Sequence, residues 1–333
     1  MEAPMSSLRR DRFRELALDF LWRQWSALGV AGHARAVGDT ILDPEALLLA
    51  TTRLGLDPRL FDEVLDWLNV NGALINLQRL QNLAPRIGER SVLDAVAAHL
   101  AKRTVHSKWK TLLRTATPAS NLRPLFPEVP VLGQTDELFA RHGWLRGPLA
   151  LRRLSQPPDP HRASNLLIKL RGLFGMQARA EVMAYLLACE SGHPREMAVR
   201  LAYFPRTLQT TLNDMAGSGH VLARREGHEK RFWLRRDEWR FLMTWSPSGS
   251  QGTAEFPRWV DWAAFFAAIE SLWRFLDRPD LDEAGPAVQA IELRACLDAM
   301  DPAFLRENID IPPGATGAAL VEAVVDRFSQ LLT

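Results

Sequence analysis

The chain has 333 residues, 47% of them hydrophobic and 24% charged, with a formal net charge of +2. This composition is ordinary for a globular protein and excludes a disordered or fibrous chain, while the length favours two or three domains. Two cysteines, Cys189 and Cys296, are too few for a disulfide framework or a zinc ribbon and suit a reducing cytoplasm. No apolar run reaches the roughly 18 residues of a membrane span, and the basic, polar residues 1–14 lack the apolar stretch of a secretory signal. We therefore expect a cytoplasmic protein without membrane contact.

The charge is distributed unevenly along the chain. Residues 95–180 carry 14 basic and four acidic side chains, whereas residues 246–333 carry six basic and 14 acidic ones. This asymmetry predicts that the middle of the chain faces a polyanion; the alternative is that it packs against the acidic tail. Trp109 in the basic stretch is expected to be a packing anchor. The side chains that would add phosphate contacts, or else lie on a solvated helix face, are Lys102, Arg103, Lys108, Lys110, Arg114, Arg141, Arg146, Arg152, Arg153 and Arg162.

The first part of the chain has a helical pattern. Apolar residues recur on one stripe over residues 11–28, which predicts a helix. The dipeptide Asp-Pro at 43–44 and again at 57–58 places an acceptor side chain at a helix cap and Pro at the first helical position, so each predicts a helix start. A further helical pattern covers residues 92–113.

Residues 44–76 contain a pattern that recurs later in the chain. The order of apolar, Pro and Gly positions over residues 54–74 is repeated over residues 201–221. By this correspondence, residues 47–72 are interpreted as a helix-turn-helix, and residues 73–76 as the strand that follows it. Its second helix is rich in acids that would repel phosphates, so we expect this copy to serve oligomerisation or partner binding rather than DNA binding. A chance alignment is the alternative, because short repeats are easy to find.

Breaks in the helical pattern divide the rest of the chain. Eight prolines lie between positions 117 and 160 and predict a connector without long helices, ending in the linker 157–160. A second break covers residues 246–252. Helices are expected near 287–299 and 318–332, and before them an apolar helix face is formed by Trp259, Trp262, Phe266, Ile269 and Trp273.

The segment 164–245 is the most informative. It predicts helices over 179–188, 194–201 and 205–215, with Pro at the first position of the last two. Two β-like runs follow, 220–225 and 230–234, joined by a turn.

The helix expected over 205–215 has one buried and one polar face. Leu208, Leu212 and Met215 recur at i, i+4 and i+7 and are expected to face the core. The helix carries one acid, Asp214, so phosphate repulsion is low. The side chains outside the apolar stripe are Arg206, Thr207, Gln209, Thr210 and Asn213.

Helix, turn, helix and basic hairpin in this order resemble the winged helix-turn-helix of bacterial transcriptional regulators of the ArsR/MarR type, over about 80 residues. The resemblance implies that the second helix enters the major groove and the hairpin grips the DNA backbone or minor groove. Arg206 suits a guanine, and the side-chain amides of Gln209 and Asn213 suit an adenine. The candidate DNA-binding residues are Arg195, Arg206, Thr207, Gln209, Thr210, Asn213, Arg224, Arg225, His228, Lys230 and Arg231.

The sequence contains no pattern that predicts an enzyme, a metal site or a cofactor. The Walker A, dinucleotide-binding, H-E-x-x-H and C-x-x-C motifs do not occur. The acidic stretch 277–283 is interpreted as a solvated turn, and Cys189 as a structural thiol. The paired thiolates that metal-sensing ArsR relatives need are missing.

The sequence therefore predicts a mainly α-helical, multi-domain protein. The expected parts are a helical, degenerate winged-helix unit at 1–94, a basic connector at 95–160, a winged helix-turn-helix at 161–245 and an acidic helical assembly domain at 253–333. The expected function is sequence-specific binding of double-stranded DNA by a homodimer that regulates transcription. The alternative is an antitoxin or defence-system protein that binds a partner through helix 259–273 and the acidic tail and uses the winged helix as a scaffold or for autoregulation.

Overall fold

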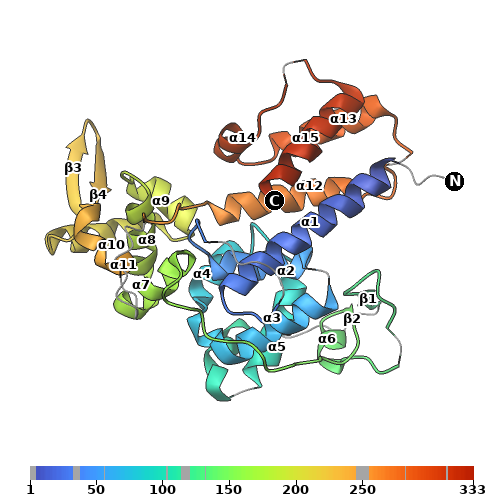
Figure 1. Cartoon of the computed structure of the whole chain (residues 1–333), viewed down its shortest axis with the longest axis horizontal. Helices are drawn as coiled ribbons and strands as arrows, with labels where there is room; N and C mark the ends of the chain where they lie inside the picture. Colours follow the sequence, from blue (N-terminus) through green and yellow to red (C-terminus); the bar gives the residue numbers. More distant parts are fainter. Residues whose placement is uncertain are drawn as a thin grey trace.

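The computed structural model is mainly helical and has two small sheets of two strands each within the residues that it describes (Figure 1). The mainly α fold expected from the sequence is therefore confirmed. The described residues are 5–32, 38–55, 57–102, 104–113, 121–131, 133–244, 255–281, 283–312 and 314–333. The predicted break at 246–252 lies outside them.

Two of the three N-terminal helices begin where the sequence predicts, and the first begins six residues before its expected start at residue 11. Helix α1 spans Met5–Ala27, α2 spans Pro44–Leu54 and α3 spans Pro58–Asn71. The carboxylates of Asp43 and Asp57 accept hydrogen bonds from the backbone three residues on, at 3.0 and 2.7 Å, and Pro occupies the first turn of both helices. The two Asp-Pro start signals are thus confirmed because the cap and the proline act within one turn of the chain.

The predicted strand over 73–76 is wrong. A 3-10 turn, η1 (Gly72–Leu74), is followed by helix α4 (Leu77–Leu83), whose first turn is capped by the Asn76 side chain. Ile75 between them is fully buried, which draws the chain into the core instead of out along a hairpin. The segment is a helix pair followed by further helices, without the hairpin that the repeat predicts.

The helix expected over 92–113 is also shorter than predicted. Helix α5 (Arg90–Ala101) ends early, and the chain continues as a 3-10 helix, η2 (Thr104–Leu112). Trp109 on η2 is fully buried and donates to the carbonyl of Gly72 at 3.3 Å, so its role as a packing anchor is confirmed.

The C-terminal helices share one core with the N-terminal ones. Helix α12 (Trp262–Leu276) packs against α1 and α2, and Phe20 of α1 lies 5.3 Å from Phe265 between ring centroids (Figure 1). Helices α13 (Pro286–Asp298), α14 (Pro302–Asn308) and α15 (Gly317–Leu331) complete this buried cluster. The ends of the chain, separate units in the sequence interpretation, are thus joined by one hydrophobic core.

The burial of α12 corrects one expectation. Trp262, Phe266 and Ile269 are at most 7% exposed, so the apolar face proposed to contact a partner is already covered by the protein's own helices. Aromatic burial of this size is characteristic of a core rather than of a docking surface.

The connector lies against the acidic helix α3. It contains β1 (Arg123–Pro124), which pairs in parallel with β2 (Trp144–Leu145), and the short helix α6 (Glu137–Arg141), so the Pro-rich segment has no long helix within its described residues. Asp62 of α3 accepts from Arg146 at 2.6 Å, Glu63 pairs with Arg152, and Asp66 accepts from a connector amide. The acids of α3 therefore hold the connector, and two arginines of the basic middle, Arg146 and Arg152, pair with this helix rather than with the acidic tail.

A second core belongs to residues 163–244. It contains η3 (Ala163–Asn165), α7 (Leu166–Phe174), α8 (Ala178–Ala188), α9 (Pro194–Leu201) and α10 (Pro205–Gly217). Strands β3 (Leu222–Glu226) and β4 (Glu229–Trp233) form an antiparallel hairpin, followed by η4 (Arg236–Trp239) and α11 (Phe241–Thr244). Both strands lie within two residues of the predicted runs. We call residues 163–244 the hairpin unit.

Candidate nucleic-acid interface

Helix α10 presents its polar side chains outward. Leu208 and Leu212 are fully buried and Met215 is 7% exposed, so the predicted inner face is confirmed. The period of 3.6 residues then turns the intervening positions toward solvent. Gln209 is half-buried, and the exposed candidates on this helix are Arg206, Thr207, Thr210 and Asn213.

The hairpin carries its basic residues on both faces. Arg225 lies opposite Lys230, and Arg224 lies opposite Arg231, so the two pairs alternate across the ladder. The Nζ of Lys230 donates to Oδ1 of Asn213 at 2.9 Å. This bond joins β4 to α10, so the polar face of the helix and the hairpin form one continuous surface at the end of the molecule (Figure 1).

Part of the hairpin charge is balanced locally. Glu226 pairs with Arg224 and lies 3.9 Å from Arg231, and the hydrogen bond from Arg224 lowers the pKa of this exposed carboxyl. Arg231 also donates to the hydroxyl of Ser191 at 3.0 Å. The basic side chains on the face toward α10, Arg225 and Lys230, have no carboxylate partner within the described residues and are the better placed cations.

Two candidates lie at the margins of this surface. Arg195 is exposed in the first turn of α9, where the His193 ring caps the helix by accepting from the Arg195 amide at 3.3 Å. His228 is exposed in the two-residue turn of the hairpin, beside Gly227 with φ of 62°. Within the described residues no contact joins either side chain to the other candidates.

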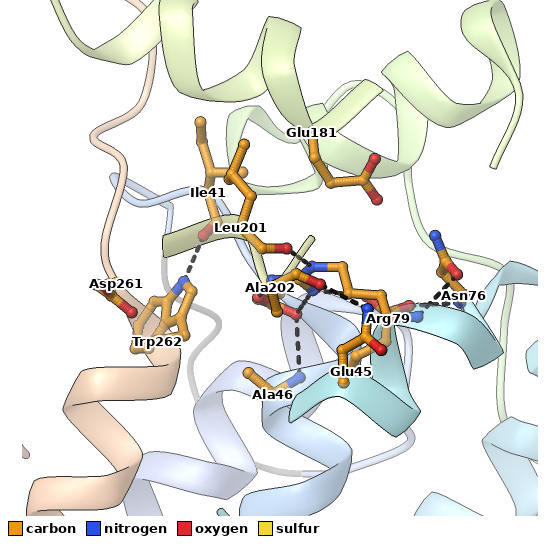
Figure 2. A network of polar contacts seen from close by, with 12 residues as sticks. Ile41, Glu45, Ala46, Asn76, Arg79, Glu181, Leu201, Ala202, Asp261 and Trp262 are labelled. Carbon is orange, nitrogen blue, oxygen red and sulfur yellow. Dashed lines mark hydrogen bonds and ion pairs between the residues drawn. The ribbon is translucent and has the colours of Figure 1, made fainter. Parts of the chain in front are cut away.

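The turn between α9 and α10 is held by helix α4. Arg79 donates to the carbonyl of Leu201 at 3.0 Å (Figure 2), and Asn82 donates to that of Ala202 at 2.9 Å. Ala202 has φ of 57°, and these contacts occupy carbonyls that the end of α9 leaves without helical partners. Asn76 donates to the Tyr203 hydroxyl at 3.0 Å. The orientation of α10 is therefore set by a helix more than a hundred residues earlier in the chain.

A buried ionic network lies beneath this turn (Figure 2). Arg79 binds Asp43 and Glu45, and Arg171 of the hairpin unit binds Glu45 and Glu181. Burial opposes the charged form of Asp43, but the Arg79 guanidinium outweighs it and holds the pKa of that carboxyl below its ordinary value. Sequence reasoning missed this network; the only signal was charge placed inside strongly apolar segments, Glu45 before a run of leucines and Arg171 within Leu-Leu-Ile-Lys-Leu-Arg.

Several basic residues of the middle segment are not available to phosphates. Arg146 is 2% exposed and lies beside three phenylalanine rings, as well as Asp62. Lys108 donates to the carbonyls of Ala73 and Ile75 at 2.7 Å, and burial lowers its pKa to about 8. The predicted phosphate contact is wrong for these two residues. Arg103 and Arg114 lie outside the described residues. Arg152 is exposed but pairs with Glu63, and the other exposed ones are Lys102, Lys110, Arg141, Arg153 and Arg162.

Other kinds of site find no support in the geometry. In the part of the chain that the structure describes, no group of three His, Cys, Asp or Glu side chains is placed to hold a metal ion. Burial raises the pKa of the Cys189 and Cys296 thiols, which disfavours the reactive thiolate. None of the described helices is long and apolar enough to span a membrane. Comparisons of the chain with protein-family models, with curated proteins and with solved structures give no match.

Proposed function

We propose that the hairpin unit is a winged helix that binds double-stranded DNA in a sequence-specific manner, and that the protein regulates transcription. The observation that carries this proposal is the surface formed by α10 and the basic hairpin, joined by the bond from Lys230 to Asn213. Helix α10 supplies polar side chains that suit base edges, and the hairpin supplies cations that suit the phosphate backbone of DNA.

The order and pairing of the elements support a winged helix. After α8, Gly192 forms an antiparallel bridge with Phe232 of β4, with N–H to carbonyl distances of 2.9 and 3.0 Å in the two directions. Helices α9 and α10 follow, and then the two strands of the hairpin. The sequence of helix, short strand contact, two helices and hairpin is the arrangement expected of this type of DNA-binding unit.

The dimensions of α10 suit the major groove of B-DNA. An α-helix with its side chains is about 10–12 Å across and the groove about 12 Å wide. Arg206 carries the donors that the two acceptors of a guanine edge need. The side-chain amides of Gln209 and Asn213 each offer one donor and one acceptor, which suits an adenine edge. The hydroxyls of Thr207 and Thr210 suit a phosphate, and their methyl groups suit a thymine methyl.

We further propose that two copies act together. One recognition helix covers one half-site, so a homodimer on a pseudo-palindrome provides the length of sequence that specific control needs. Selection from random duplex DNA should then enrich two inverted half-sites, and the complex should contain two protein chains by its mass in solution.

The test is selection of bound sequences from random duplex DNA by the purified chain at two salt concentrations. We expect an enriched motif, with binding that weakens steeply as salt rises. Arg206→Ala should relax the preference at one position of each half-site, at a cost of about 1–3 kcal/mol for the preferred base. Lys230→Ala should weaken binding to all sequences alike. Arg306→Ala, an exposed arginine on α14 outside the proposed interface, is the matched control.

Three outcomes would contradict the proposal in different ways. Salt-sensitive binding without a motif would exclude base readout and leave a backbone-only binder. Equal loss of sequence preference in Arg206→Ala and Lys230→Ala would contradict the roles assigned to helix and hairpin. Absence of binding at both salts would favour the partner-binding alternative, with the hairpin unit as a scaffold.

A further inference from the structure

A polar groove of about 560 Å³ lies between α4 and α10, on the boundary of the two cores. Seven of its twelve lining residues carry an amide or a hydroxyl, and Met176, Ala178 and Phe204 add apolar surface. The residues used below are Gln78 and Asn82 of α4, Gln177 and Arg179 at the start of α8, and Thr207 and Thr211 of α10.

The groove and the hairpin flank opposite sides of α10. Successive residues of an α-helix are about 100° apart, so Asn213 lies on one flank and Thr207 and Thr211 lie on the other. Asn213 bonds to Lys230 of the hairpin, whereas the two threonines line the groove. The exposed positions Arg206 and Thr210 lie between these flanks. The outer face of α10 therefore has the basic hairpin on one side and the polar groove on the other.

A helix in the major groove has a phosphate strand on each side. If the hairpin contacts one strand, the other passes over the opposite flank of α10. We propose that the groove between α4 and α10 binds this second phosphate strand, with Arg179 as its cation, so that α4 belongs to the DNA interface. This inference rests on the proposed function of the hairpin unit and extends it beyond the winged helix.

The charges around the groove suit a phosphate at one position. Arg179 is exposed and, within the described residues, has no carboxylate within ion-pair distance. Among the described residues that line the groove, Arg179 is the cation and Asp214 the acid. Both side chains also line a neighbouring groove of about 480 Å³. Hydroxyls and amides such as those of Thr207 and Gln177 donate to phosphate oxygens without adding charge.

The two walls of the groove are held in place before DNA binds. The bond from Asn82 to the Ala202 carbonyl and that from Arg79 to the Leu201 carbonyl fix α4 against the turn that precedes α10. A site with fixed walls needs little ordering of side chains on binding, which preserves affinity. The same contacts explain how a helix outside the hairpin unit reaches the same DNA strand as Thr207.

The test measures binding of the full chain to a fluorescent random-sequence duplex over a series of salt concentrations. Arg179→Ala removes one phosphate contact, so we expect several-fold weaker binding and a salt slope smaller by about one. Selection from random duplex DNA should give the same motif for this variant as for the wild type. Gln78→Glu places a negative charge on the α4 side and should weaken binding as well, whereas Gln78→Lys should strengthen it. Arg306→Ala, at an exposed position of α14 that has no part in the proposed interface, is the control, and thermal unfolding checks that each variant is folded.

The outcomes separate this inference from the proposed function. If Lys230→Ala weakens binding while Arg179→Ala and both Gln78 variants bind like the wild type, the second strand does not use this groove and the inference is wrong. If the wild type binds no duplex, the proposed function and the inference both fail. If the Arg179 and Gln78 variants change affinity and salt slope as expected, α4 is part of the interface.

Discussion

Glu270 shows how a single buried side chain joins distant segments. It lies on α12, is 1% exposed and accepts two hydrogen bonds from the amide of Gly88, at 2.8 and 3.1 Å. Burial raises the pKa of this carboxyl to about 7, although the Gly88 amide, Arg53 and Arg274 oppose the shift. The residue that ties α12 to the loop before α5 therefore titrates near neutral pH.

This titration predicts a pH-dependent stability. Between about pH 4.5 and 7 the folded protein holds a proton on Glu270 that the unfolded chain has lost, so stability falls as pH rises through this window, by up to about 3 kcal/mol. Glu270→Gln keeps an acceptor for Gly88 and removes the titration. Urea unfolding at pH 5 and pH 8 should show the variant gaining stability over the wild type at the higher pH. The same pH dependence in both proteins would rule out Glu270 as the cause.

At the scale of elements, the turn between α9 and α10 depends on α4. Arg79 is 3% exposed and serves both the ionic network and the carbonyl of Leu201. A buried network of this kind is costly to break, because removal of one partner leaves a charge without compensation in a poorly solvated place. The position of α10 is thus coupled to the integrity of α4.

Arg79→Met should destabilise the protein by about 3–5 kcal/mol, since Asp43 then remains buried without its cation. Arg141→Met is the matched control, because Arg141 is exposed and 3.8 Å from Glu137, and it should change stability by less than about 0.5 kcal/mol. The free energies of unfolding from urea titration at neutral pH give the comparison. Similar values for the two variants would mean that the network adds little to the fold.

At the scale of the molecule, the first and last helices behave as one body. Trp262 donates to the carbonyl of Ile41 at 2.6 Å (Figure 2). Its ring stacks on that of Phe266, with centroids 5.6 Å apart, inside the core shared by α1, α2 and α12. A chain without residues 1–85 would lose the partners of α12. Loss of a dimer in such a chain would therefore not show that the N-terminal helices form its interface.

Trp262→Ala should lower stability by about 3–5 kcal/mol and keep a single unfolding transition for the N- and C-terminal helices. Trp273→Ala, at a half-buried position of the same helix, is the control and should cost less. Differential scanning calorimetry measures both effects. Two separate transitions in Trp262→Ala would indicate that the two ends of the chain fold independently.

The sequence by itself determined the features that depend on neighbours within a few residues. The Asp-Pro caps of α2 and α3, the buried stripe of Leu208 and Leu212, and the hairpin after α10 all follow from local geometry and period. The outward-facing side of α10 could be predicted for the same reason, because its three apolar positions define which of its residues point away from the core.

Only the tertiary structure decided what the remaining surfaces contact. Asp62 and Arg146 are 84 positions apart in the sequence, and their ion pair joins the acidic helix α3 to the basic connector. Ile75 lies in the core, so the expected strand over 73–76 is instead part of η1 followed by the residues that precede and cap α4. Helix α12 is covered by α1 and α2. These contact partners come from distant parts of the chain. The charge or apolar character of a segment does not by itself tell which of several complementary surfaces will cover that segment.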